Sequence, residues 1–300
     1  MDIIYDLLSM LPFDWLSYGF MKNALLAVLL ITPLFGLLST MVVSNRMAFF
    51  SDSLGHGAFT GLALGAILGI FSPTMSLILF SVVFALLITW IKNNSTASTD
   101  TIIGVFSSVG IAAGLMMMSY GGGFNKYSSY LIGDILSITQ EEIQSLALVL
   151  VVVLLAWGWI FNRLLILSVN SSFARSRGIS VMLVEGVFAA MVAVVVAISI
   201  QWVGLLIINS LLVLPGAAAR NVAQSVKQYH LFSVAFAMVA DISGLVLAYY
   251  FNMAAGATIV VIAAGIFFVT LLLKGKMAKY AIGITNSCHK GEIVLYYLSR

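Results

Sequence analysis

Charged residues are scarce in this chain. Only 8% of its 300 residues are Asp, Glu, Lys or Arg, whereas 62% are hydrophobic and the mean hydropathy is +1.11. Soluble domains carry about 25% charged residues, so the composition excludes an ordinary soluble protein. The apolar stretches are long and continuous, as in residues 143–159, unlike the short alternating segments of a membrane β-barrel. We therefore expect an integral membrane protein built of helices.

Cysteine and the common catalytic motifs are also nearly absent. The single cysteine, Cys288, excludes an internal disulfide and a cysteine-rich metal cluster. The sequence has no G-x-x-x-x-G-K-[ST] phosphate loop, so the chain does not bind ATP by that route. It also has no H-E-x-x-H or G-x-S-x-G motif. These absences predict that the chain is not an enzyme and binds no permanent cofactor, and nothing in the sequence suggests a nucleic-acid partner.

Long apolar segments predict the fold. A helix needs about 20 apolar residues to cross a bilayer. The candidate spans are 17–43, 54–71, 73–92, 101–120, 143–168, 183–201, 203–222, 231–252 and 256–273. The segment 203–222 contains Gly204, Pro215 and Gly216, so it is either a ninth span or a broken, re-entrant helix. The prediction is an all-α, polytopic membrane protein with eight or nine transmembrane helices, a single membrane domain over 1–280 and a tail over 281–300.

The distribution of basic residues predicts the orientation. With the N-terminus outside and nine crossings, twelve of the fourteen Lys and Arg residues fall in inner segments, and only Lys22 and Lys126 fall in outer ones. Inner segments of membrane proteins are enriched in Lys and Arg. We therefore predict an N-out, C-in topology, with the tail on the cytoplasmic side.

One inner connection, residues 169–182, has the pattern of a short helix. It begins with the cap-like sequence Asn170-Ser171-Ser172, continues through Phe173, Ala174 and Arg175, and stops at Gly178. A short helix between two spans on the cytoplasmic side is a natural docking element for a soluble partner.

An aspartate and a histidine stand four residues apart in this otherwise uncharged sequence. Asp52 and His56 would lie on one face of a helix, one turn apart. Carboxylate oxygen and imidazole nitrogen suit zinc, manganese or iron(II), and two copies of the chain would supply two oxygens and two nitrogens. The alternatives are structural: Asp52 caps a helix N-terminus, or His56 bonds a carbonyl of a neighbouring span. The spacing alone does not choose between these readings.

For the other ionisable residues within or near the spans we favour structural roles. Asp241 lies near the middle of its span and is either a further metal ligand or, as we favour, a helix–helix contact. Glu185 is expected to be solvated or paired with Arg177, and His230 is expected at the surface.

Two pairs of glycines are spaced for close helix packing. Gly57 and Gly61 form one small-residue face, directly after His56, and Gly110 and Gly114 form another. Such faces let helix backbones approach closely. They indicate packing rather than chemistry.

Several ordered motifs resemble one transporter family. The segment 45–56, Asn-Arg-Met-Ala-Phe-Phe-Ser-Asp-Ser-Leu-Gly-His, followed by Gly61, is similar to a signature of zinc- and manganese-type ABC transporter permeases. Further similar stretches follow in order, at 100–105, 130–136, 203–220 and 256–260. The resemblance extends from about residue 20 to residue 275.

The resemblance implies a partner set and a metal path. It implies a permease homodimer in the lipid of a bacterial or archaeal plasma membrane, two cytoplasmic ATPase subunits and an extracytoplasmic metal-binding protein. Asp52 and His56 match the family pair implicated in the metal path. Residues 169–182 match the ATPase-contacting helix, keeping Arg175 and Gly178 but having Ser171-Ser172 where an acidic start is common.

The predicted function is therefore the permease subunit of an ATP-driven importer for a divalent transition metal. The form of the segment around Asp52 favours zinc, with manganese or iron next. The alternative from another class is a secondary transporter that works alone, with Asp241 and Asp52 carrying protons. Such transporters show two related halves, and no second copy of the 45–61 pattern is evident.

Overall fold

The protein is helical throughout the part that is described. The computed structural model describes residues 2–9, 12–69, 72–120 and 129–274, and over these it contains helices and no strand. This confirms the predicted all-α class. The tail at 281–300, with Cys288 and His289, lies outside the described residues, so the division into a membrane domain and a tail remains a prediction.

Seven described helices are long and apolar enough to cross a membrane. They are α2 (Gly19–Ser44), α4 (Pro73–Asn94), α5 (Thr99–Tyr120), α8 (Gln140–Val169), α10 (Val181–Val203), α12 (Val226–Phe251) and the helix Ala255–Lys274. Two further helices, α3 (Ala48–Leu68) and α11 (Leu205–Val222), occupy the two remaining predicted spans. The polytopic helical architecture is thereby confirmed.

Short helical pieces connect the long ones. They are α1 (Asp2–Ser9), η1 (Asp14–Ser17), α7 (Ser129–Ile132), η2 (Ile135–Ser137) and α9 (Ser171–Ser176). Helices α7 and η2 lie in the connection between α5 and α8, and α9 lies in the inner connection that was predicted to contain a short helix. At the start of α8, the Thr139 side chain and the Glu142 carboxylate cap each other's backbone amides, which satisfies donors at the helix N-terminus.

The segment 203–222, whose glycines and proline suggested a possible break, contains a continuous helix. Gly204, at φ 88°, ends α10, and α11 then runs unbroken from Leu205 to Val222 with Pro215 inside it. The amide of Gly216, the residue after Pro215, donates to Ser39 Oγ of α2 at 2.8 Å. The Ser39 hydroxyl of α2 thus accepts a hydrogen bond from the backbone amide next to Pro215. A helix that contains proline can stay continuous when a neighbouring helix satisfies its backbone in this way.

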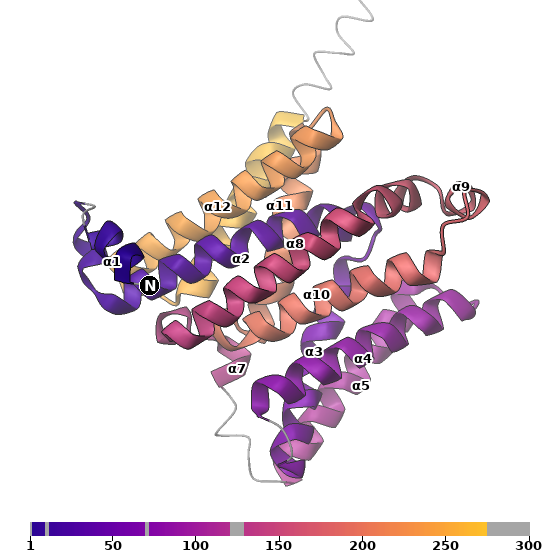
Figure 1. The fold of residues 1–300 in the computed structure, drawn as a ribbon, viewed down its shortest axis with the longest axis horizontal. Helices are drawn as coiled ribbons and strands as arrows, with labels where there is room; N and C mark the ends of the chain where they lie inside the picture. Colours follow the sequence, from indigo (N-terminus) through magenta and orange to yellow (C-terminus); the bar gives the residue numbers. More distant parts are fainter. Residues whose placement is uncertain (1, 10–11, 70–71, 121–128, 275–300) are drawn as a thin grey trace, which may run out of the picture.

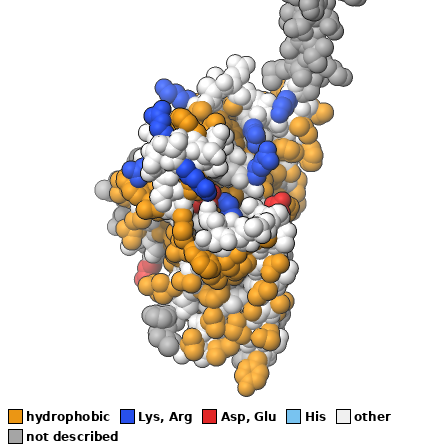
Figure 2. Space-filling model, turned by 90° about the vertical axis from the view of Figure 1, so that its right-hand side faces the viewer, with side chains coloured by type: hydrophobic (Ala, Val, Ile, Leu, Met, Phe, Trp, Pro, Cys, Tyr) orange, Lys and Arg blue, Asp and Glu red, His pale blue; other side chains and the backbone are white. Residues whose placement is uncertain are grey.

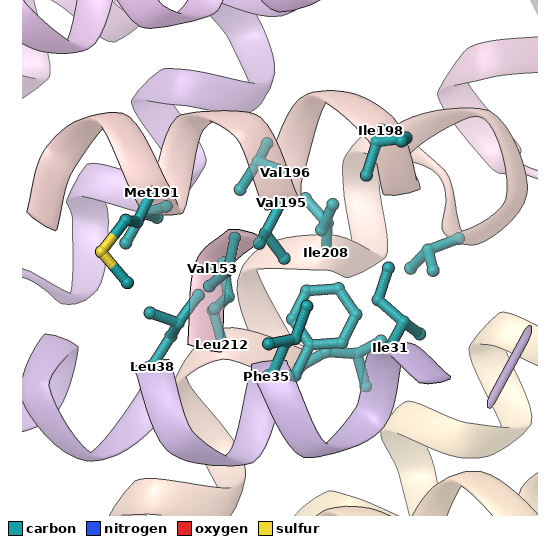
Figure 3. Packing of buried hydrophobic residues seen from close by; sticks show 14 of the residues in the cluster. Ile31, Phe35, Leu38, Val153, Met191, Val195, Val196, Ile198, Ile208 and Leu212 are labelled. Carbon is teal, nitrogen blue, oxygen red and sulfur yellow. The ribbon is translucent and has the colours of Figure 1, made fainter. Parts of the chain in front are cut away.

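The long helices form two groups around a shared centre. In Figure 1, α2, α8 and α10 cross the middle of the molecule, with α12 on one side and α3, α4 and α5 on the other. Helix α11 packs against α2, α12 and α3 and so links the two groups. Apolar side chains fill the centre, where Phe35 and Leu38 of α2 face Val195 of α10 and Leu212 of α11 (Figure 3).

Basic side chains gather at one end of the bundle. Figure 2 shows Lys and Arg side chains clustered over one face of the molecule. Among the described residues, those near the helix ends on this side are Arg46, Lys92, Arg163, Arg175, Arg177, Arg220, Lys227 and Lys274, whereas Lys22 lies at the opposite end of α2. We call this side the basic end. It is the side that the sequence predicts to face the cytoplasm.

Candidate metal site and docking helix

A tight turn between α2 and α3 sets the position of the aspartate. The Met47 amide donates to Val42 O at 2.9 Å and the Arg46 amide donates to Val43 O at 3.3 Å. These bonds form a Schellman motif, in which Arg46 takes the left-handed position at φ 55°. Met47 is buried at 3% exposure. Helix α3 therefore begins at Ala48 rather than at residue 54, which places Asp52 inside the helix, in its second turn.

Asp52 and His56 face each other on α3, as their spacing predicts. His56 Nε2 lies 3.5 Å from Asp52 Oδ2, and the two side chains are 16% and 37% exposed, respectively. Asp52 does not cap the helix, because the N-cap position belongs to Met47. His56 Nδ1 is buried and has no hydrogen-bond partner within the described chain, so it does not bond a carbonyl there. Neither structural alternative for the pair matches this geometry.

The pair lies on the least covered face of α3. Phe49, on the same side of the helix, is 65% exposed. Ser107 of α5 is close enough to interact with the Asp52 carboxylate. On the neighbouring face, the Ser51 hydroxyl donates to Asn209 Oδ1 of α11. The carboxylate and imidazole are therefore partly exposed on α3, with α5 and α11 packed on neighbouring faces of the helix.

Glycines hold the rest of α3 tightly among its neighbours. A Cβ added at Gly57 would lie 2.5 Å from Phe84 Cδ1, and one added at Gly61 would lie 2.5 Å from Phe80 Cβ, both on α4. On another face, a Cβ at Gly110 of α5 would lie 3.1 Å from the Gly57 nitrogen. Both predicted small-residue faces are therefore packing surfaces, and they fix the helix that carries Asp52 and His56.

One chain supplies only part of a metal site. The described residues contain no group of three or more His, Cys, Asp or Glu side chains able to hold a metal ion. Zinc sites in proteins commonly have three or four protein ligands. Asp52 Oδ2 and His56 Nε2 supply one oxygen and one nitrogen, so the described chain offers fewer than three ligands of the His, Cys, Asp and Glu types at this place.

Asp241 lies elsewhere, sealed between two helices. The Thr32 hydroxyl of α2 donates to Asp241 Oδ2, while Oδ1 is buried and has no partner among the described residues. The residue is only 4% exposed. The structure therefore places Asp241 in a contact between α2 and α12 and does not bring it together with Asp52 and His56.

The predicted docking segment forms α9, at the right-hand end of Figure 1. Asn170 caps it, with Asn170 Oδ1 accepting from the Phe173 amide at 3.0 Å, and Gly178 follows it at φ 72°. Phe173 is 48% exposed, and Arg175 and Gly178 are also at the surface. Ala174 is fully buried and anchors the short helix to the bundle. Of the four predicted docking residues, Phe173, Arg175 and Gly178 are thus accessible to a partner and Ala174 is not.

One expected environment is wrong, and a second has contacts that the sequence did not predict. Glu185 is not paired with Arg177: its Oε1 lies 2.9 Å from Lys92 Nζ and its Oε2 accepts from Asn93 Nδ2 at 2.8 Å. His230 is partly exposed, as predicted for a surface residue, and its ring also packs edge-on against Phe161 and Trp157 of α8. Both partners come from helices distant in sequence, which local spacing does not reveal.

A bundle of apolar helices, with an aspartate–histidine pair on one helix and a short exposed helix at its basic end, defines a multi-pass helical membrane protein. The chain belongs to the ABC 3 transport family, whose model matches residues 17–274.

Named relatives and one solved structure cover nearly the whole chain. It is 30% identical over 260 residues to a manganese import system permease protein, ScaB, of Streptococcus gordonii, covering 87% of this chain and 93% of that protein. It is 28% identical over 251 residues to a high-affinity zinc uptake system membrane protein, ZnuB, of Buchnera aphidicola, covering 83% and 96%. Its fold matches PsaBC from Streptococcus pneumoniae in complex with Fab, with a TM-score of 0.74, 29% identity and coverage of 90% and 95%.

Proposed function

We propose that this chain is the permease subunit of an ATP-driven importer for a divalent transition metal, with zinc as the first candidate. The observation that carries the proposal is the Asp52–His56 pair, with Nε2 and Oδ2 3.5 Å apart at the open face of α3. Ionisable groups inside spans are costly and mark ion pathways. The family and the metals named for its relatives support the same cargo.

A homodimer would complete the site. Two copies of the pair supply two carboxylate oxygens and two imidazole nitrogens, which is a suitable set for a tetrahedral ion. The exposure of Phe49 and Asp52 leaves room for a second copy at this face. A site shared between two chains can also open when the chains move, and a transported ion must leave as readily as it enters.

The choice of zinc over manganese rests on ligand chemistry and on the sequence around Asp52. Mixed oxygen and nitrogen ligands bind zinc more tightly than manganese. Relatives named for zinc and for manganese are 28% and 30% identical to the chain, so identity does not separate the two metals. Manganese, then iron, are the next candidates.

The remaining parts of the importer would be separate proteins. Phe173, Arg175 and Gly178 at the basic end would contact a cytoplasmic ATPase subunit, which would hydrolyse ATP, while the permease itself catalyses no reaction. The ion would arrive from an extracytoplasmic metal-binding protein on the opposite side. The gathering of basic residues at the end that carries α9 supports the N-out, C-in topology.

Reconstitution tests this proposal. The purified chain is placed in liposomes with and without its ATPase subunits, metal-loaded binding protein is added on one side and ATP on the other, and accumulation of zinc is measured. We expect accumulation only with both the ATPase and ATP. Zinc transport by the chain alone, driven by a proton gradient, would instead establish the secondary transporter.

A further inference from the structure

An ion pair joins the docking region to a neighbouring helix. Glu185 lies in the second turn of α10, which begins shortly after α9 and is capped by Ser180. Its carboxylate bonds two consecutive residues at the end of α4, Lys92 at 2.9 Å and Asn93 at 2.8 Å. The Lys92 and Glu185 side chains are only 19% and 15% exposed. Solvent therefore screens this pair less than it screens a surface salt bridge.

The end of α4 also forms part of the surface beside α9. A cavity of about 500 Å³ opens at the basic end, with Asn93 and Asn94 of α4 on one wall and Arg175 and Gly178 on the other. Glu185 thus ties α10 to α4 next to the place where a partner seated on α9 would press.

Helix α4 leads directly from this point to the metal pair. Farther along α4, Phe84 packs on Gly57 and Phe80 packs on Gly61 of α3. Gly57 is adjacent to His56 in the chain. A shift of α4 along its axis must therefore move α3, because the Phe84 ring already occupies the space where a Cβ of residue 57 would stand. Packed helices transmit such shifts since their interfaces do not deform continuously.

We propose that Lys92, Asn93 and Glu185 form a coupling strut that carries movement of the ATPase-docking region through α4 to the Asp52–His56 helix. These are positioning residues, because they touch neither the metal nor the nucleotide. The inference rests on the proposed function, since it needs an ATPase that acts at α9. Without the strut, ATP is still hydrolysed by the attached ATPase, but fewer metal ions cross for each ATP.

The test measures zinc accumulated and ATP hydrolysed in the same liposomes, which contain the full complex and the metal-binding protein. Glu185→Gln and Lys92→Met should each lower zinc moved per ATP by about 2- to 30-fold, with ATP hydrolysis retained. The exchange variant Lys92→Glu/Glu185→Lys should recover most of the loss, because it restores the pair with reversed charges. Lys227→Met removes an exposed cation near the same end and should leave the ratio unchanged.

The possible results distinguish failure of the coupling strut from failure of the proposed importer function. A ratio equal to wild type in both single variants, or an exchange variant no better than the single ones, would overturn the strut while leaving the importer intact. No ATP-driven zinc accumulation by the wild-type complex would instead overturn the proposed function. If a single variant does not fold, Asn93→Ala weakens the same contact more gently and should lower the ratio in the same direction. An unchanged ratio there also counts against the strut.

Discussion

Two intramembrane aspartates of this chain have opposite environments. Asp52 is 37% exposed and faces an imidazole at an open helix face, whereas Asp241 is 4% exposed and faces a threonine hydroxyl inside a helix contact. Both are carboxylates in apolar helices, and both are candidates by residue type. If Asp52 binds the transported ion, as proposed, then access and a neighbouring second ligand, rather than the presence of a carboxylate, distinguish an ion site from a helix contact.

The largest expected effect follows from removing either group of the open pair. In cells that import zinc through this system, Asp52→Ala and His56→Ala should each reduce uptake by at least about 10- to 100-fold, because each removes a ligand. Uptake of radioactive zinc at matched protein levels measures this. Ser81→Ala, which removes a buried hydroxyl of α4 that has no partner among the described residues, should leave uptake near wild type. Undiminished uptake in both ligand variants would remove the assigned site.

Substitutions of the sealed aspartate should change stability rather than transport. Asp241→Ala leaves the Thr32 hydroxyl without its acceptor and should lower the free energy of unfolding by about 1–3 kcal/mol. Asp241→Asn keeps an oxygen acceptor for Thr32, so it should cost less. Thermal unfolding in detergent compares the two variants. Equal stability of Asp241→Ala and wild type would show that the contact between α2 and α12 does not depend on this carboxylate.

Loss of the close packing of α3 beside Asp52 and His56 should lower stability by a similar amount. Gly57→Ala places a methyl group 2.5 Å from the Phe84 ring, and such overpacking should cost about 1–3 kcal/mol. Because Gly57 adjoins His56, uptake should also fall. Gly158→Ala on α8 is the matched control, since a Cβ there meets nothing within 4 Å. If both alanine variants behave alike in thermal unfolding and uptake, close packing of α3 on α4 is not required.

The smallest effect concerns the turn that introduces α3. Arg46 holds φ 55° at a position where glycine is favoured. Arg46→Gly removes this strain but makes the unfolded chain more flexible, so the variant should gain about 1 kcal/mol or less. A small rise in melting temperature would support the turn as described. A clear fall in melting temperature would mean that the Arg46 side chain stabilises the fold by more than the left-handed backbone conformation destabilises it.

Much of the fold could be predicted from the sequence, because a helix that crosses a membrane needs a long run of apolar residues. The start of α3 could not. Residues 48–53 include Ser51, Asp52 and Ser53, which lower the local hydropathy, and the left-handed position of the turn holds Arg46 instead of a glycine. The helix begins earlier than its apolar run because the turn and the packing against its neighbours, rather than local hydropathy, set its first residue.

The site was only partly predictable for a related reason. Spacing of four placed Asp52 and His56 on one helix face, which the structure confirms. The partner of Glu185 depends on how α4 and α10 pack, since Lys92 is 93 positions away in sequence. The prediction of a pair with Arg177, which is close in sequence, was therefore wrong. The ring contacts of His230 likewise come from α8. Local patterns do not encode such distant contacts.

The most direct test compares Asp52→Asn with Asp241→Asn in liposomes that contain the complete importer. Both substitutions replace a carboxyl group by an amide and keep the side-chain size. The open aspartate should be essential, so ATP-driven zinc accumulation should be lost in Asp52→Asn and remain near wild type in Asp241→Asn. Retained accumulation in Asp52→Asn together with loss in Asp241→Asn would contradict the account, because the ion path would then pass the sealed aspartate.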